Sequence, residues 1–144
     1  MEQDLMGKVI VTVKIENLHD LYDEERGLLC PEQVRSLDIT NALVDTGATT
    51  LSMPRRMIEQ LGLRPYRQRR ARTAAGSVTL QMHGAVRLTI QDRDCISDVA
   101  EVPEDCPVLI GQIPLEALDL VVDSAGRRLI GNPEHGGEHM IELY

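Results

Sequence analysis

The chain is divided into short apolar runs separated by glycine, proline and acidic segments, and this spacing constrains its fold more than any other feature. The runs are rich in valine, isoleucine and leucine and are too short for long helices. They predict strands at 9–15, 38–44, 69–74, 77–82, 84–90, 96–102, 107–111, 120–122 and 128–130. Because no long amphipathic helix alternates with these runs, βαβ units are not expected. The sequence therefore predicts an all-β fold.

Two short helices are expected between the strands. The first has Ser52 or Met53 as its cap, Pro54 in its first turn and Gly62 after its last residue, which is a typical order of start and stop signals. The second covers Leu115 to Leu118. The polar, acidic stretch 16–37 is expected to be an irregular loop with at most a short helical turn.

A β-hairpin is expected at 69–82, with Ala75 and Gly76 at its turn. Five arginines precede or occupy its first arm: Arg64, Arg67, Arg69, Arg70 and Arg72. They make the middle third of an acidic chain basic, since residues 46–88 carry a net charge of +7 and the whole chain −8. Two interpretations stay open, a solvated strand face or a basic rim that attracts acidic substrate segments.

Composition limits the function. With 144 residues the chain is expected to form one domain, 1–144, with a core over about 8–132 and a tail over 133–144. The three tyrosines, no phenylalanine and no tryptophan argue against stacking platforms for single-stranded nucleic acid, and the negative charge argues against nucleic-acid binding in general. No apolar run is long enough to span a membrane, and Met1 to Asp4 do not resemble a signal peptide.

Three cysteines without CxxC spacing predict neither a disulfide framework nor a zinc site, and they fit a reducing, cytoplasmic location. They are expected to be buried or half-buried. In the tail, His135 and His139 are four residues apart, but Gly136 and Gly137 between them disfavour a helical metal pair, so a polar tail is expected. No cofactor or metal is predicted.

The strongest chemical signal is Asp45-Thr46-Gly47-Ala48, which directly follows an apolar strand. A carboxylate at the end of a buried strand is costly unless it is hydrogen-bonded or functional. Thr46 supplies a hydroxyl, and Gly47 allows close backbone approach and offers an unobstructed N–H. A second signal lies downstream, where the apolar residues 108–110 run into Gly111 and a short helix.

The two motifs in this order resemble the retropepsin-like (clan AA) aspartic proteases, over about residues 9–132. The resemblance implies a closed β-barrel with a flap hairpin and one or two short helices, forming half of a symmetric dimer. It implies that Asp45 is the catalytic aspartate, that Thr46 links the two active-site loops across the dimer axis, and that Gly47 contacts the substrate. Thr49 stands where retroviral members usually have an aspartate.

Further site residues are implied by the same resemblance. Ala48 and Thr49 are expected to contact the substrate, the hairpin tip to act as a flap, and the apolar strand before Gly111 to lie behind the catalytic loop. The implied substrate-binding set is Ala48, Thr49, Ala74, Ala75, Gly76, Ser77, Leu109 and Ile110. Since aromatic residues are scarce, the cleft is expected to be lined by Leu, Ile, Val and Met.

One Asp-Thr-Gly in the chain supplies only one of the two carboxylates that this chemistry needs. Asp123-Ser124-Ala125-Gly126 has the wrong pattern and is interpreted as a turn. The sequence therefore predicts a homodimeric endopeptidase that acts on peptides or proteins. The main alternative is a non-catalytic module that kept the fold for dimerisation or peptide binding. Phosphoryl chemistry would need a phosphate-cradling α/β scaffold, which the pattern does not indicate.

Overall fold

The computed structural model describes residues 8–143, so the expectations for Met1 to Asp4 and for Tyr144 lie outside the described residues. Strands are the predominant secondary structure of this chain, as predicted. The strands are β1 (Val9–Asn17), β2 (Ser36–Val44), β3 (Leu51–Pro54), β4 (Arg64–Thr73), β5 (Gly76–Ile90), β6 (Arg93–Val102), β7 (Leu109–Ile110), β8 (Leu120–Asp123) and β9 (Arg128–Gly131). The all-β class is thereby confirmed.

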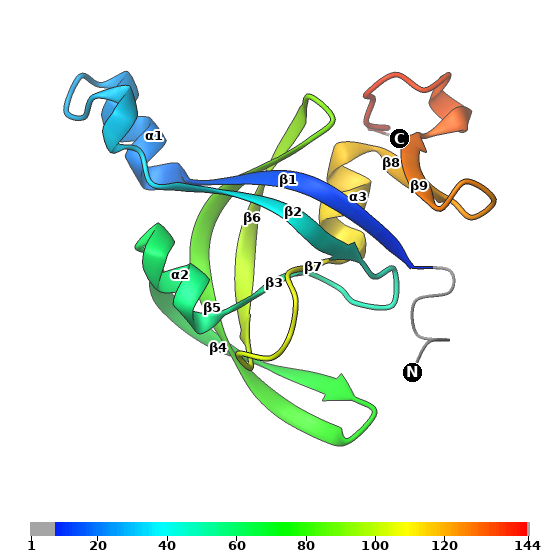
Figure 1. Cartoon of the computed structure of the whole chain (residues 1–144), viewed down its shortest axis with the longest axis horizontal. Helices are drawn as coiled ribbons and strands as arrows, with labels where there is room; N and C mark the ends of the chain where they lie inside the picture. The colour runs from blue at the N-terminus through cyan, green and yellow to red at the C-terminus, as the bar shows by residue number, and fades with distance from the viewer. Residues whose placement is uncertain (1–7, 144) are drawn as a thin grey trace.

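Six of these strands form a closed ring (Figure 1). The order around the ring is β1-β2-β7-β3-β6-β5, and β5 returns to β1 through antiparallel pairs such as Lys14 with Thr89. The pairings β2–β7 and β3–β6 are parallel, and the others in the ring are antiparallel. Closure leaves no free edge inside the barrel. β4 pairs only with β5, and the two extend away from the ring as a long hairpin.

The hairpin differs from its prediction in three details. Its first strand, β4, begins at Arg64, five residues earlier than expected. Its turn is formed by Ala74 and Ala75, one residue earlier than expected. The two strands predicted at 77–82 and 84–90 are one continuous strand, β5, whose pairing with β6 shifts between His83 and Val86. An irregularity in register was therefore mistaken for a break between strands. The first part of β5 belongs to the hairpin, and the second part closes the barrel.

The segment before the first predicted helix is also different. Leu51–Pro54 form the buried strand β3, whereas Ser52, Met53 and Pro54 were expected to start a helix. Pairing with β6 and β7 satisfies their backbone groups within the barrel. The helix α2 (Arg55–Leu61) starts one residue later with Pro54 as its N-cap, and Gly62 ends it with a positive φ of 67°, as predicted.

The acidic stretch 16–37 contains more structure than the expected loop. It forms the helix α1 (Leu18–Glu25) and the 3-10 helix η2 (Pro31–Gln33), which project from one end of β1 and β2 (Figure 1). Asn17 caps α1 by accepting the Asp20 N–H at 2.9 Å, and its amide donates to the Leu61 carbonyl at 2.7 Å. Asp20 in turn accepts two hydrogen bonds from the Arg35 side chain, which lower the pKa of the carboxyl.

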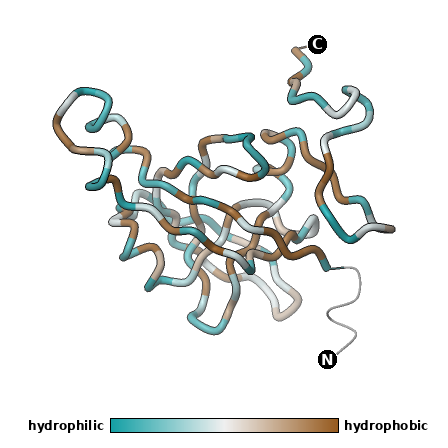
Figure 2. The backbone as a smooth tube through the Cα atoms, turned by 45° about the horizontal axis from the view of Figure 1, so that its top comes forward, coloured by the Kyte–Doolittle hydropathy of each residue, from teal (hydrophilic) through white to brown (hydrophobic). Residues whose placement is uncertain are grey.

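The core inside the barrel is aliphatic. Hydrophobic and hydrophilic residues alternate along the strands in Figure 2, as expected where one face of a strand is buried. The largest fully buried side chains are Ile15, Leu51, Met53, Ile58, Leu61, Leu88, Ile90, Ile110, Leu115, Leu118, Val13 and Val86. Two cysteines are half-buried as expected, but Cys30 is exposed, because it lies in the projecting segment beside η2.

Beyond the barrel, α3 (Gln112–Leu118) leads into the separate β8–β9 hairpin and the 3-10 helix η3 (Pro133–His135). These last elements lie at the end of the molecule opposite α1 (Figure 1). None of the helices within residues 8–143 combines the length and the apolar character that a membrane crossing requires.

Candidate active site

Asp45 follows the last residue of β2, and its backbone is fixed by the neighbouring strand. Its N–H donates to the carbonyl of Ile110 at 3.0 Å, which extends the β2–β7 pairing by one residue. The Ala48 N–H donates back to the Asp45 carbonyl at 3.0 Å and closes a turn. Within this turn the Gly47 N–H donates to Asp45 Oδ1 at 2.9 Å. The carboxylate is therefore oriented by its own loop while remaining half-buried.

Behind the loop, β7 and the start of α3 approach it closely. The N–H groups of Gln112 and Ile113 donate to the carbonyls of Ala48 and Thr49, each at 2.9 Å. A Cβ added to Gly111 would lie 2.5 Å from the carbonyl oxygen and 2.6 Å from the backbone nitrogen of Thr50. Glycine is therefore required at 111 because a Cβ would not fit. Its backbone conformation does not require glycine, since a φ of −89° is open to other residues.

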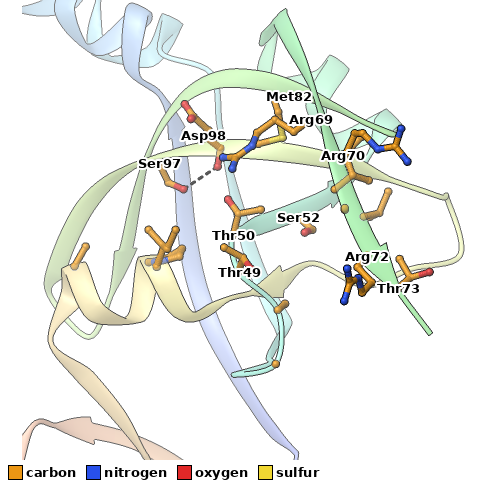
Figure 3. Close-up of a pocket in the computed structure, with 18 of the residues that line it drawn as sticks. Thr49, Thr50, Ser52, Arg69, Arg70, Arg72, Thr73, Met82, Ser97 and Asp98 are labelled. Carbon is orange, nitrogen blue, oxygen red and sulfur yellow. Dashed lines mark hydrogen bonds between the residues drawn. The ribbon is translucent and has the colours of Figure 1, made fainter. Parts of the chain in front are cut away.

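In front of the loop there is a cavity of about 660 Å³, bounded by the β4–β5 hairpin, β6 and α3 (Figure 3). The predicted site residues Gly47, Ala48 and Thr49 lie in its wall. Its larger apolar residues are Leu80, Met82, Ile96, Val102 and Ile113, which agrees with the lining expected from the composition. Its polar and charged residues include Thr50, Ser52, Arg69, Arg70, Arg72, Thr73, Ser97 and Asp98.

Other predicted residues do not line this cavity. Among them are Asp45 and Thr46, which directly precede Gly47 in the same loop. The hairpin-tip residues 74–77 are exposed beyond its end. Leu109 and Ile110, grouped with the substrate-binding residues, do not line it, and Ile110 has no exposed surface. They support the loop from behind instead, so a direct contact of Ile110 with substrate is excluded in this conformation.

Several wall residues were missed by the sequence analysis. Leu80 and Met82 are two residues apart on β5, and the two-residue period of a strand assigns both to one face of the hairpin. Ile96 and Asp98 alternate on β6 in the same way. A local pattern does not show that these faces line a cavity beside the Asp45 loop, because that proximity depends on closure of the ring.

Asp98, a cavity-wall residue on β6, is held by a tyrosine of the hairpin. The Tyr66 hydroxyl donates to Asp98 Oδ2 at 2.6 Å. This hydrogen bond raises the pKa of the Tyr66 phenol, while the positive charges of Arg67 and Arg69 act in the opposite direction. Tyr66 lies at a register shift of β4, where an extra residue lets its side chain reach β6.

The C-terminal tail is bound to the barrel rather than free. Asp119, at the end of α3, accepts hydrogen bonds from His135 Nδ1 at 2.7 Å and from the Met140 N–H at 3.1 Å. His135 Nε2 lies 3.0 Å from Glu142. The His135 contact holds the pKa of Asp119 at about 2, and both carboxylates raise the pKa of His135. His139 contacts the Ala117 carbonyl, so the two histidines have different partners.

Among residues 8–143, no group of three or more His, Cys, Asp or Glu side chains is placed to hold an ion. The chemistry available at the loop is that of one oriented carboxylate beside backbone N–H groups and a partly apolar cavity.

The chain is similar to known proteins both in its sequence, to a family model, and in its structure. Residues 38–117 match the model of a family described as "gag-polyprotein putative aspartyl protease". The structure is similar to the solution structure of the simian foamy virus (mac) protease, with 19% identity, a TM-score of 0.45, and coverage of 74% of this chain and 90% of that one. No curated protein matches the chain. Because the family match extends over more than half of the 144 residues, the chain belongs to the retropepsin-like aspartyl protease family.

Proposed function

We propose that the protein is an aspartic endopeptidase that works as a homodimer, with Asp45 of each chain in one shared site. The catalytic core of its single domain covers about residues 8–132. The observation that carries this proposal is the position of Asp45, which ends a barrel strand in a tight turn, with its carboxylate oriented by the Gly47 N–H beside the cavity. Family membership makes peptide hydrolysis the chemistry to test first.

A single carboxylate is insufficient for this reaction. Peptide hydrolysis without a covalent intermediate needs one carboxylate that takes a proton from water and one carboxylic acid that gives a proton to the carbonyl oxygen. Among the described residues no second carboxyl is bonded to Asp45. A second copy of the chain, related by a twofold axis near the loop, supplies the missing group.

Repulsion between the two carboxylates then sets their protonation. At about 4 Å and an effective dielectric near 20, two unit charges repel by about 4 kcal/mol. At 1.36 kcal/mol per pH unit, this separates the two titrations by about 3 units. As in aspartic proteases generally, one proton is shared between the two groups over an acidic to near-neutral range, and the two values belong to the pair.

The remaining loop residues position the reacting groups. Gly47 holds the Asp45 carboxylate, and Thr46, which is exposed, can link the two loops across the axis through its hydroxyl. The Gly47 backbone contacts the substrate near the scissile bond, and Ala48 and Thr49, which lie in the cavity wall, contact the substrate beside it. The hairpin tip at Ala74 to Ser77 covers the substrate as a flap, and its exposure leaves it free to move toward a bound peptide.

The decisive experiment compares Asp45→Asn with Asp123→Asn in a peptide-library cleavage assay between pH 4 and pH 7. Asp123 ends β8 before the Ser124-Ala125-Gly126 turn, so it is a matched control outside the cavity. We expect Asp45→Asn to abolish cleavage while sedimentation and circular dichroism are unchanged, and Asp123→Asn to remain active. Full activity of a protein that sediments as a monomer would refute the shared site.

Mixing separates a shared site from two independent ones. In an equal mixture of wild type and Asp45→Asn that has exchanged subunits, about one quarter of the dimers contain two wild-type chains. A shared site therefore retains about a quarter of the activity per chain, whereas independent sites retain about half. A wild type that cleaves no peptide in the library but still dimerises or binds peptide would favour the non-catalytic module.

A further inference from the structure

Arg69 is placed on the side of the hairpin that faces the cavity. It pairs directly with Leu80 across β4 and β5, and directly opposed residues project from the same face of a sheet. Leu80 and Met82 line the cavity, so Arg69 shares their face. In Figure 3 its guanidinium is directed toward Asp98. Arg70 pairs with the exposed Thr79 and points away from the cavity, although the strand there borders it.

The Arg69 charge has no partner among the described carboxylates. The arginines that form ion pairs in the described chain are Arg26, Arg35, Arg55, Arg56, Arg87 and Arg128. Asp98 is the nearest acidic residue in the cavity wall, and its Oδ2 already accepts the Tyr66 hydroxyl. A substrate carboxylate that entered the cavity would therefore meet a guanidinium that is free to form a bidentate contact.

The positive charge is also local. Arg69 faces the cavity, whose wall contains one aspartate, while the complete chain has a net charge of −8. Arg70 and Arg72 extend the positive charge along the outer face of the same strand. A basic cleft in an acidic protein raises the local concentration of anionic ligands and repels cationic ones.

The rest of the wall favours a peptide over a nucleic acid. It includes no aromatic side chain on which a base could stack, and single-stranded nucleic-acid sites generally use such platforms. Its aliphatic residues, among them Leu80, Met82 and Ile96, suit apolar side chains next to an acidic one.

We propose that Arg69 is a specificity-determining residue that selects peptides with a glutamate or aspartate beside an apolar cleavage site, and that Arg70 and Arg72 steer such peptides to the cleft. This inference rests on the proposed peptidase function and names its substrate class. One charge-assisted contact at a partly exposed site changes affinity by about fivefold.

The test uses labelled decapeptides with a Leu-Leu centre, in which the flanking positions are randomised among Glu, Gln and Lys. Binding is measured on Asp45→Asn, which binds without cleaving, and on the same protein with Arg69→Gln or Arg64→Gln added. Arg64 starts β4 outside the cavity and forms no ion pair with a described residue, so it controls for the loss of one charge. Cleavage ratios are measured in parallel on chains that keep Asp45.

We expect bound peptides to be enriched about fivefold in Glu over Gln, and to be depleted of Lys. Arg69→Gln should remove the Glu preference, Arg64→Gln should keep it, and 1 M NaCl, where the Debye length is about 3 Å, should weaken it. Equal binding of Glu and Gln peptides, equal losses in the two variants, no peptide binding, or better competition by an RNA decamer than by the Glu peptide would each overturn the inference. Glu-selective binding through Arg69 without any cleavage would instead refute the peptidase function alone.

Discussion

Replacing Gly111 by alanine tests how the Asp45 loop is held in place. The added Cβ would lie 2.5 Å from the Thr50 oxygen, 2.6 Å from the Thr50 nitrogen and 2.7 Å from the Thr49 carbonyl carbon. Ordinary contacts begin at 3.4 Å, so the loop or the start of α3 must move by about 0.7–0.9 Å. The atoms that clash are backbone atoms, and no side-chain rotation relieves the overlap. The φ of −89° is open to alanine, so the perturbation is purely steric.

The structure sets the size of both expected effects. Overpacking of a close-packed region costs about 1–3 kcal/mol, and a clash with rigid backbone places Gly111→Ala near the upper end. Movement of the loop also strains the hydrogen bonds from Gln112 and Ile113 to Ala48 and Thr49. Misplacement of a reacting group by about 1 Å costs on the order of 10²-fold in rate. We therefore expect a loss of about 3 kcal/mol in stability and of about two orders of magnitude in kcat.

Urea denaturation and peptide cleavage measure these two quantities on the same samples. Gln112→Ala is the control. Gln112 follows Gly111, its side chain is exposed, and its substitution leaves the backbone hydrogen bond to Ala48 intact. It should change the free energy of unfolding by less than about 0.5 kcal/mol. Wild-type stability and kcat in Gly111→Ala would refute the close approach. A loss of stability with unchanged kcat would show that α3 yields and that the loop stays in place.

Two further predictions concern the ends of the barrel. Asn17→Ala removes the cap of α1 and leaves the Leu61 carbonyl without its donor, so thermal and urea unfolding should show a loss of about 2–3 kcal/mol; a loss below about 0.5 kcal/mol would contradict this role. The second prediction concerns the Asp119–His135 pair and is tested by urea unfolding at a series of pH values. The pKa of His135 is raised above its ordinary 6.5, so on the alkaline side the stability that the pair contributes is complete at pH 6.5 and is lost as the pH rises through the raised value. The pKa of Asp119 is lowered from 3.8 to about 2, so that contribution is present above pH 3.8 and is lost as the pH falls toward 2. His135→Asn should remove the alkaline loss, and an unchanged pH profile would show that this pair does not hold the tail.

The strands were largely predictable because each is a local pattern. Alternation in β5 and the β-branched run in β1 are visible within a few residues of sequence. The prediction was wrong where pairing between distant segments decides which secondary structure forms. Ser52 to Pro54 read as a helix start, but bonds to β6 and β7, far along the chain, make them a strand. In the same way, the contact between Asn17 and Leu61 stabilises α1 from 44 residues away.

The candidate site was predictable in its chemistry and only partly in its walls. Asp45 and Gly47 form a hydrogen bond two residues apart, so the motif itself carries that information. The cavity wall combines the loop with β4, β5, β6 and α3, which only ring closure brings together. For this reason the sequence left two interpretations of Arg69. Its position on an exposed strand was predictable, but the pairing with Leu80, which places it on the face toward the cavity, was not.

The way in which the loop is held also shows which of its side chains the geometry requires. The hydrogen bonds that fix the loop from behind join backbone groups of β7 and α3 to backbone groups of residues 45–49, and backbone groups are the same in every residue type. Side chains matter only where a carboxylate, an unobstructed N–H or the absence of a Cβ is needed, at Asp45, Gly47 and Gly111. The family match, residues 38–117, begins in β2 and ends in α3, and so contains both sides of this contact. The backbone bonds that hold the loop therefore place no requirement on the side chains of the other loop residues, whereas closure of the ring depends on the apolar alternation of the strands.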